Sequence, residues 1–186
     1  MTRVDNQQIF WNTQSILGNG FYYKDGKQIF LRLSKKQMQA CRVYLPDEVD
    51  KIKKKTDFPH RKGGKRCVYG CYNIDSFAMA LERLSDGSHK SEQNILVLNL
   101  ANPVNPGGGV LKGSKAQEED LCRRSTLSAS LFSETAQEYY LYNRSLNTFM
   151  GSDAIIITPE VEILKDESGT ILEKTAIVSV DRKSVM

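Results

Sequence analysis

The sequence predicts an α/β layered fold with a mixed sheet. Two stretches, residues 95–100 and 154–158, are almost uniformly apolar, as expected of strands that are buried on both faces of a sheet. Amphipathic helices with caps alternate with such strands, for example residues 76–84 behind Asp75. This order is typical of helices packed on a sheet. A chain of 186 residues, 40% hydrophobic and 26% charged, is long enough for one such domain.

The N-terminal part of the chain indicates a helix, a hairpin and a second helix. Helical spacing over residues 9–17 is followed by two glycines that end the helix. Asp25-Gly26 is a strong two-residue hairpin turn between two short strands. Ser34 is suited to cap a second helix, which we expect to continue to Val43.

After residue 66 the pattern changes to alternating strands and helices. The expected elements are a strand at 67–69, a helix at 76–84, a strand at 95–100, helices at 117–129 and 134–146, a strand at 154–158, a hairpin of 161–164 with 170–173, and a strand at 175–180.

Residues 51–66 concentrate positive charge in a chain whose net charge is +4. Two interpretations stay open, a solvated loop or a patch that attracts a polyanion through counterion release. Phe58 is the one aromatic residue there, so sequence-specific recognition of nucleic acid is not indicated. The N-terminus lacks the apolar stretch of a signal peptide, and no apolar run is long enough to span a membrane.

The cysteines and histidines indicate a reduced protein without a metal site. Four cysteines are too few and too scattered for a disulfide scaffold, so we expect a cytoplasmic protein. His60 and His89 have no cysteine or aspartate at the spacing of a zinc site.

The loop between the strand at 95–100 and the helix at 117–129 carries the most informative residues. In α/β sheets this position, after the carboxyl end of a strand, is where ligands bind. Three glycines at 107–109 allow the backbone to approach a ligand closely and to expose N–H groups to phosphate oxygens. The triplet matches neither the P-loop nor the dinucleotide fingerprint. Nearby asparagines either serve turns or hold a ribose hydroxyl.

Gln117-Glu118-Glu119 opens the helix that follows the glycines. Acids at a helix N-terminus are also explained by the helix dipole alone. Consecutive helical residues point about 100° apart, so the two carboxylates cannot perform one task symmetrically. We expect one to face a scissile bond and the other to hold the sugar or face solvent.

The segment NPGGGVLKGSKAQEE resembles the signature of poly(ADP-ribose) glycohydrolases, a glycine triplet followed by Gln-Glu-Glu. Its flanks, ILVLNLAN and DLCRRSTL, are similar to the microbial type of that family, whose catalytic domain is a macrodomain. The resemblance implies a macrodomain-like three-layer α/β/α fold with a mixed sheet over residues 67–186. Residues 1–66 would form an N-terminal helical and hairpin extension that packs on this core.

The resemblance also implies an activity and its residues. The enzyme would hydrolyse ribose–ribose O-glycosidic bonds in poly(ADP-ribose) and release ADP-ribose, without a cofactor or a metal. Glu119 matches the residue that protonates the leaving ribose oxygen and then activates water, and Glu118 matches the acid that holds ribose hydroxyls. Asn102 or Asn105 would contact the distal ribose. The other implied substrate-binding residues are Gly107, Gly108, Gly109, Val110 and Gln117. The implied partners are poly(ADP-ribose), ADP-ribose and ADP-ribosylated proteins, but no membrane and no sequence-specific nucleic acid.

The chemistry requires Glu119 to carry a proton. A glycosidic oxygen is a poor leaving group until it is protonated, whereas a helix N-terminus stabilises the carboxylate anion. A substrate diphosphate nearby would disfavour ionisation. We therefore hypothesise that Glu119 becomes a proton donor mainly when substrate is bound. Identical acidic limbs in the pH profiles of kcat and kcat/KM would contradict this.

The end of the chain departs from the family. Relatives continue well past Val180 with further strands and a second glycine-rich loop, and residues 181–186 do not resemble that continuation. We therefore expect a C-terminally truncated sheet whose open edge exposes apolar residues, and weak or absent activity. Two alternatives to the enzyme are a non-catalytic ADP-ribose-binding macrodomain module and an inactive fragment of the glycohydrolase. The paired acids favour the enzyme over the module.

Overall fold

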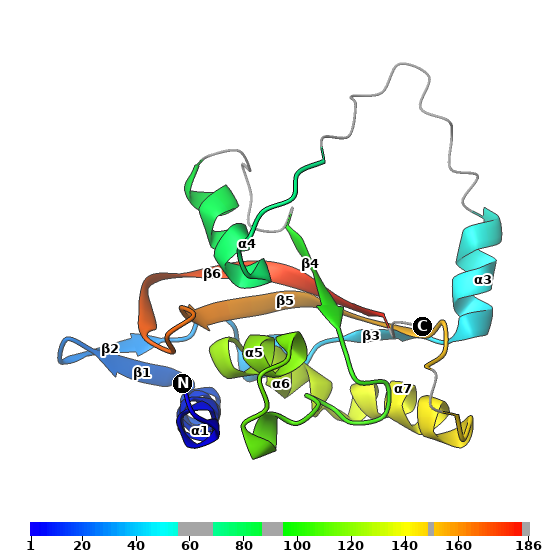
Figure 1. Ribbon diagram of the computed structural model, residues 1–186, viewed down its shortest axis with the longest axis horizontal. Helices are drawn as coiled ribbons and strands as arrows, with labels where there is room; N and C mark the ends of the chain where they lie inside the picture. Colours follow the sequence, from blue (N-terminus) through cyan, green and yellow to red (C-terminus); the bar gives the residue numbers. More distant parts are fainter. Residues whose placement is uncertain (56–68, 87–94, 149–150, 184–186) are drawn as a thin grey trace.

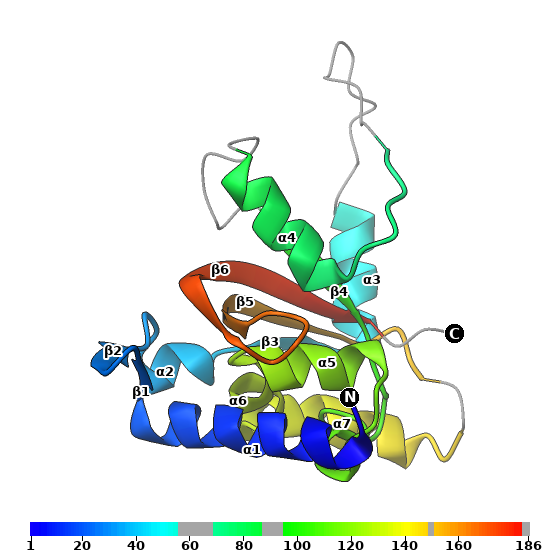
Figure 2. The ribbon, with the colours of Figure 1, turned by 60° about the vertical axis from the view of Figure 1, so that its left-hand side comes forward.

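The computed structural model describes residues 1–55, 69–86, 95–148 and 151–183. In these residues a mixed sheet lies between helices (Figure 1). Helix α4 (Ser76–Ser85) lies on one side of the sheet, and α1 (Arg3–Asn19) and α5 (Gln117–Arg124) lie on the other (Figure 2). The predicted α/β fold with helix layers around a mixed sheet is confirmed. The predicted Asp75 cap is also present, because its carboxylate accepts the N–H groups at the start of α4.

The N-terminal helix and hairpin follow the sequence prediction. Helix α1 ends at Gly20, which has a φ of 76°. Strands β1 (Phe21–Lys24) and β2 (Lys27–Phe30) pair antiparallel around Asp25 and Gly26, whose φ angles are 50° and 74°. Positive φ at both central residues is what a tight hairpin turn requires.

The prediction of a helix from Ser34 to Val43 was wrong beyond its first turn. Ser34 does cap a helix, but α2 (Lys35–Met38) is only four residues long. The chain then forms β3 (Arg42–Tyr44), which pairs antiparallel with β5 of the main sheet. Val43 pairs with Ile156 of β5, and both side chains are β-branched. This pairing outweighs the weak local preference for helix.

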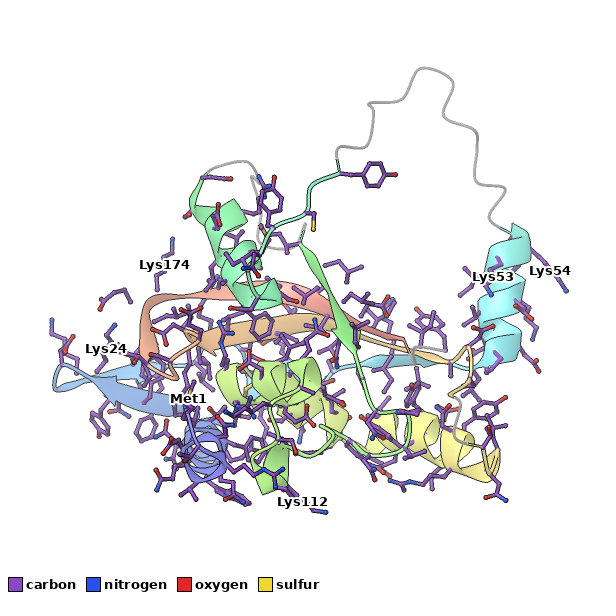
Figure 3. All side chains as sticks on the ribbon, viewed as in Figure 1. Met1, Lys24, Lys53, Lys54, Lys112 and Lys174 are labelled. Atoms are coloured by element: carbon purple, nitrogen blue, oxygen red, sulfur yellow. The ribbon has the colours of Figure 1, made fainter. Side chains whose placement is uncertain are left out.

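Helix α3 (Pro46–Lys55) was missed, because the sequence interpretation placed its second half in the basic stretch. Its signals are visible in hindsight. A proline occupies the first helical position, acids fill the first turn and lysines the last. Lys53 and Lys54 are exposed on this helix, far from Lys112 (Figure 3). Residues 56–66 of the basic stretch lie outside the described residues.

The main sheet has the order β3-β5-β6-β4 within the described residues. Strands β5 (Ile155–Lys165) and β6 (Ile171–Lys183) form a long antiparallel hairpin, and β4 (Leu96–Leu100) is parallel to β6. The sequence predicted four shorter segments here. The two segments of β5 join because the register shifts between Thr158 and Val161, and this shift accommodates the proline between them without ending the strand.

The prediction that strand β4 is buried on both faces was wrong, because its side chains alternate between buried and exposed. Val97 and Asn99 face the core. Leu96, Leu98 and Leu100 face away from it and are 61%, 50% and 53% exposed. Within the described residues β3 and β4 are the two edge strands, and the exposed leucines give β4 an apolar outer face.

The single helix predicted for residues 117–129 is divided into α5 and α6 (Leu127–Leu131). Ser125 is extended and bridges to Ile163 of β5, while Thr126 exchanges hydrogen bonds with Glu162. Contact with the sheet interrupts the helix. The helix predicted for residues 134–146 is confirmed as α7 (Glu134–Ser145).

Residues on both sides of the expected boundary at residue 66 build the sheet, since β3 precedes it and the other three strands follow. Of the predicted strand at 67–69, only Tyr69 is described, and it lies outside any strand. His60, His89 and Cys67 lie outside the described residues. Among the described helices, none combines the length and the apolarity needed to cross a bilayer.

Candidate functional site

The glycine loop connects β4 to α5. Gly107 and Gly108 have φ angles of 66° and 56°, which residues with a Cβ adopt only at a cost. The chain then forms a short 3-10 helix, Val110–Lys112, before it enters α5. Helix α1 lies beneath this segment, where the Asn6 amide donates to the Gly113 carbonyl at 3.0 Å. Helix α1 therefore supports the loop directly.

The loop packs against the two predicted acids. A Cβ on Gly108 would lie 2.6 Å from Glu119 Oε1 and 3.2 Å from Glu118 Oε2. A Cβ on Gly109 would collide with the Ser114 hydroxyl. Glycine at 108 thus lets the carboxylates approach the backbone, and glycine at 109 makes room for Ser114.

Glu119 lies on the side of α5 that faces the glycine loop. Its side chain is buried, with 7% exposed, and its Oε1 accepts the Gly109 N–H at 2.7 Å. The other oxygen, Oε2, is buried and has no hydrogen-bond partner among the described residues. One oxygen is therefore fixed by the backbone, while the second is left for another group.

Glu118 is buried more deeply, with 2% exposed. Its Oε2 accepts the Asn102 N–H at 2.8 Å, and its Oε1 accepts the Gly107 N–H at 3.1 Å. Both oxygens therefore bind the protein backbone. The sequence correctly indicated that the two acids have different surroundings, but it did not foresee this bridge.

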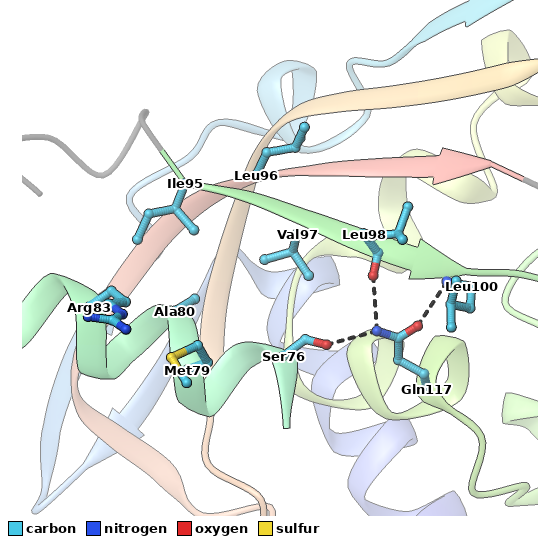
Figure 4. A pocket seen from close by; sticks show the side chains of 10 residues that line it. All are labelled: Ser76, Met79, Ala80, Arg83, Ile95, Leu96, Val97, Leu98, Leu100 and Gln117. Carbon is cyan, nitrogen blue, oxygen red and sulfur yellow. Dashed lines mark hydrogen bonds between the residues drawn. The ribbon is translucent and has the colours of Figure 1, made fainter. Parts of the chain in front are cut away.

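Gln117 was expected to contact substrate, and the structure places its amide on the free edge of β4. Its Oε1 accepts the Leu100 N–H at 2.8 Å, and its Nε2 donates to the Leu98 carbonyl at 2.9 Å and to the Ser76 hydroxyl at 2.8 Å (Figure 4). The amide stands where a neighbouring strand would bind. A pocket of about 540 Å³ lies between α4 and β4, with Gln117 in its lining.

The asparagines before the loop have distinct surroundings. Asn102 Oδ1 accepts the N–H groups of Val104 and Asn105, which is a turn role, and the Asn105 side chain is exposed. Asn99 lies earlier in the chain, within β4. Its amide is fully buried, and neither of its atoms has a hydrogen-bond partner among the described residues.

The N–H groups of the loop are not free, contrary to the expectation of exposed donors. Gly107 and Gly109 donate to the two glutamates. Gly108 donates to the Asn105 carbonyl, and Val110 donates to the Gly107 carbonyl. A phosphate could bind these donors only by displacing such acceptors.

Two buried cations, Arg124 and Lys165, connect the C-terminal end of α5 to neighbouring elements. Their role was not predicted from the sequence. Arg124, whose side chain is 3% exposed, pairs with Asp75 at 3.0 Å and with Asp120 at 2.8 Å. Its guanidinium also donates to the carbonyl of Lys165, whose buried ammonium donates to α1. Burial lowers the pKa of Lys165 to about 8. The i,i+4 spacing of the Asp120–Arg124 pair was the available signal.

Burial also raises the pKa of Glu162, a carboxyl group that accepts hydrogen bonds from Thr175 and from the Arg32 backbone. This group lies in the β5–β6 hairpin, not beside the glycine loop. Within the described part of the chain, no three His, Cys, Asp or Glu side chains come together in a way that could hold a metal ion.

Comparison with known proteins identifies the family. The sequence profile described as microbial-type PARG, catalytic domain, matches residues 11–166. A comparison with curated protein sequences gave no significant match.

Solved structures of poly(ADP-ribose) glycohydrolases have a similar fold. The enzyme from Thermomonospora curvata bound to the inhibitor ADP-HPD is 26% identical, with a TM-score of 0.80 over 97% of this chain and 62% of that chain. The enzyme from Deinococcus radiodurans in complex with ADP-ribose is 29% identical, with a TM-score of 0.70 over 83% of this chain and 58% of that chain. This chain thus spans less than two thirds of their length. With the profile match and the buried glutamates on the glycine loop, we conclude that the chain belongs to the microbial-type poly(ADP-ribose) glycohydrolase family.

Proposed function

We propose that this chain carries the catalytic centre for hydrolysis of ribose–ribose O-glycosidic bonds in poly(ADP-ribose), which releases ADP-ribose. The observation that carries the proposal is the asymmetry of Glu119. Its Oε1 is held by the Gly109 N–H, whereas its buried Oε2 has no partner in the described residues. A buried oxygen that is oriented in this way can present a proton to a reacting group.

In the proposed reaction, Glu119 Oε2 donates its proton to the glycosidic oxygen as the bond from that oxygen to the anomeric carbon breaks. The developing oxocarbenium-like centre is then attacked by water. The carboxylate takes the proton of that water, which regenerates the acid. The products of each such hydrolysis are one ADP-ribose and a polymer that is shorter by one unit.

The glycine loop is the proposed seat of the substrate diphosphate and of the distal ribose. A diphosphate bound at this loop would bring negative charge beside the carboxyl group of Glu119. Like charges disfavour ionisation, so substrate binding would favour the protonated acid. This supports the hypothesis that Glu119 becomes a proton donor mainly in the complex.

The expected targets are ADP-ribosylated proteins. We also propose a cytoplasmic location, since the described cysteines, Cys41, Cys71 and Cys122, are all free thiols, which suits a reducing compartment.

The decisive experiment is incubation of automodified, poly(ADP-ribosyl)ated protein with the purified chain, followed by measurement of released ADP-ribose. Glu119→Gln is expected to abolish release and to leave ADP-ribose binding largely intact. Glu134→Gln is the matched control, because Glu134 is an exposed acid in the first turn of α7. Binding without release by the unaltered chain would identify a non-catalytic ADP-ribose-binding module. Neither binding nor release would identify an inactive fragment.

A further inference from the structure

The first turn of α5 contacts the strand and the glycine loop in the order of the sequence. Gln117 binds the main chain at Leu98 and Leu100. Glu118 binds the N–H groups of Asn102 and Gly107, and Glu119 binds that of Gly109. Three consecutive side chains therefore hold three successive parts of one backbone segment.

The contact at Gln117 requires both a donor and an acceptor. In the described part of the chain β4 pairs with another strand, β6, on one side only, so the Leu100 N–H and the Leu98 carbonyl on its other side take their partners from a side chain. An amide side chain supplies one acceptor and one donor in fixed geometry, whereas a carboxylate supplies only acceptors. The same amide reaches the Ser76 hydroxyl at the start of α4. Gln117 thus fixes the end of β4 against two helices.

The contact at Glu118 closes the first part of the loop. Its two oxygens bind N–H groups that lie five residues apart in the sequence, at Asn102 and Gly107. The carboxylate is buried at the helix N-terminus, where negative charge is stabilised. Hydrogen bonds to a charged acceptor are stronger than those between neutral groups. The span between the two N–H groups is therefore held from inside.

We propose that Gln117 and Glu118 are positioning residues, which clamp the end of β4 and the start of the loop so that Gly109 meets Glu119. The catalytic part of this inference rests on the proposed function, but the clamp itself requires no ligand. It gives Gln117 a task on the protein backbone in place of the expected substrate contact. It also explains why a strand end, a glycine triplet and Gln-Glu-Glu occur together in this chain.

The clamp is tested by measuring amide hydrogen exchange in the purified chain without ligand, with NMR to monitor each amide. In Gln117→Met the Leu100 amide is expected to exchange about tenfold faster or more, as for loss of one hydrogen bond. In Glu118→Gln the same is expected for the Asn102 or Gly107 amide. Rates are taken relative to the Val178 amide of β6, so that a general loss of stability cancels.

Two control variants make the result specific. Ser76→Ala removes one partner of the Gln117 amide but keeps both bonds to β4, so the Leu100 amide should stay protected. Glu134→Gln should leave all of these amides unchanged. Wild-type relative exchange rates in both Gln117→Met and Glu118→Gln would overturn the clamp.

Kinetics separate a positioning role from a contact with ligand. If the two residues act as a clamp, Gln117→Met and Glu118→Gln should each lower kcat and also speed amide exchange at the positions named above. If KM and the Kd for ADP-ribose rise while exchange at Leu100, Asn102 and Gly107 is unchanged, the residues are ligand contacts and the proposal is wrong. If the unaltered chain releases no ADP-ribose, the proposed function fails, and the exchange data still decide the clamp.

Discussion

Substitution of Gly108 by alanine tests whether the glycine loop is shaped around Glu119. Gly108 has a φ of 56°, and a Cβ there would lie 2.6 Å from Glu119 Oε1. The atom in the way is the end of a side chain, which can rotate. The backbone therefore need not move, but the carboxylate must leave the Gly109 N–H.

The expected loss of stability is moderate, whereas the expected loss of function is large. Alanine at a positive φ costs about 1–2 kcal/mol, and the charged hydrogen bond that is lost contributes about 1.5–3 kcal/mol in favourable cases. Misplacement of a reacting group by about 1 Å can lower the rate about 100-fold. We therefore expect Gly108→Ala to fold and to lose at least about 100-fold in kcat.

Gly20→Ala is the matched control. Gly20 has a φ of 76°, and a Cβ there would meet nothing within 4 Å. Gly20→Ala therefore has the free-energy cost of alanine at a positive φ but no collision with a side chain. Urea unfolding and ADP-ribose release are measured for both variants. The reasoning is refuted if Gly108→Ala retains the kcat of the unaltered chain, or if both variants lose activity in proportion to their loss of stability.

Three further outcomes follow from buried charge and from the open edge. Burial lowers the pKa of Lys165 from 10.5 to about 8, so between these values the unfolded chain binds more protons. The free energy of unfolding should therefore rise with pH over this range, by up to about 3 kcal/mol, and urea titrations should show a flatter profile in Lys165→Met. Arg124→Met leaves Asp75 and Asp120 without their buried cation and should lower the free energy of unfolding by about 3 kcal/mol. Arg83→Met breaks a half-exposed ion pair and should lower it by less than about 1 kcal/mol in the same titration. Leu98→Lys replaces an exposed leucine on the outer face of β4 with a charge, and it should not lower the melting temperature and should lower any light scattering from aggregates.

Local signals identified helices α1, α4 and α7 and the first hairpin correctly. Asp25-Gly26 and Asp75 act within a few residues of chain, so their turn and cap formed as predicted. Errors arose where a distant strand competed with local preference. Residues 39–43 left the predicted helix because Val43 pairs with β5, and Ser125 interrupted another helix by bridging to the same strand.

For the candidate site too, local signals predicted the positions of the residues, and contacts between distant segments decided their surroundings. The spacing of the glycines and of Gln-Glu-Glu placed both acids on the loop, since a loop that enters a helix brings its first turn back to the preceding strand end. The hydrogen-bond partners of each side chain could not be predicted from the sequence. The exposed N–H groups expected for a phosphate are bonded within the protein, and Gln117 faces β4.

The sequence by itself determined the layered fold, the family and the pair of acids, because hydrophobic periodicity and short motifs act over a few residues. Only the tertiary structure decided which strands form the edges of the described sheet, that Glu119 keeps one oxygen unpartnered among the described residues, and that Glu118 bridges the loop. These features depend on which donors and acceptors meet after segments far apart in the chain have packed together. No local pattern contains that information.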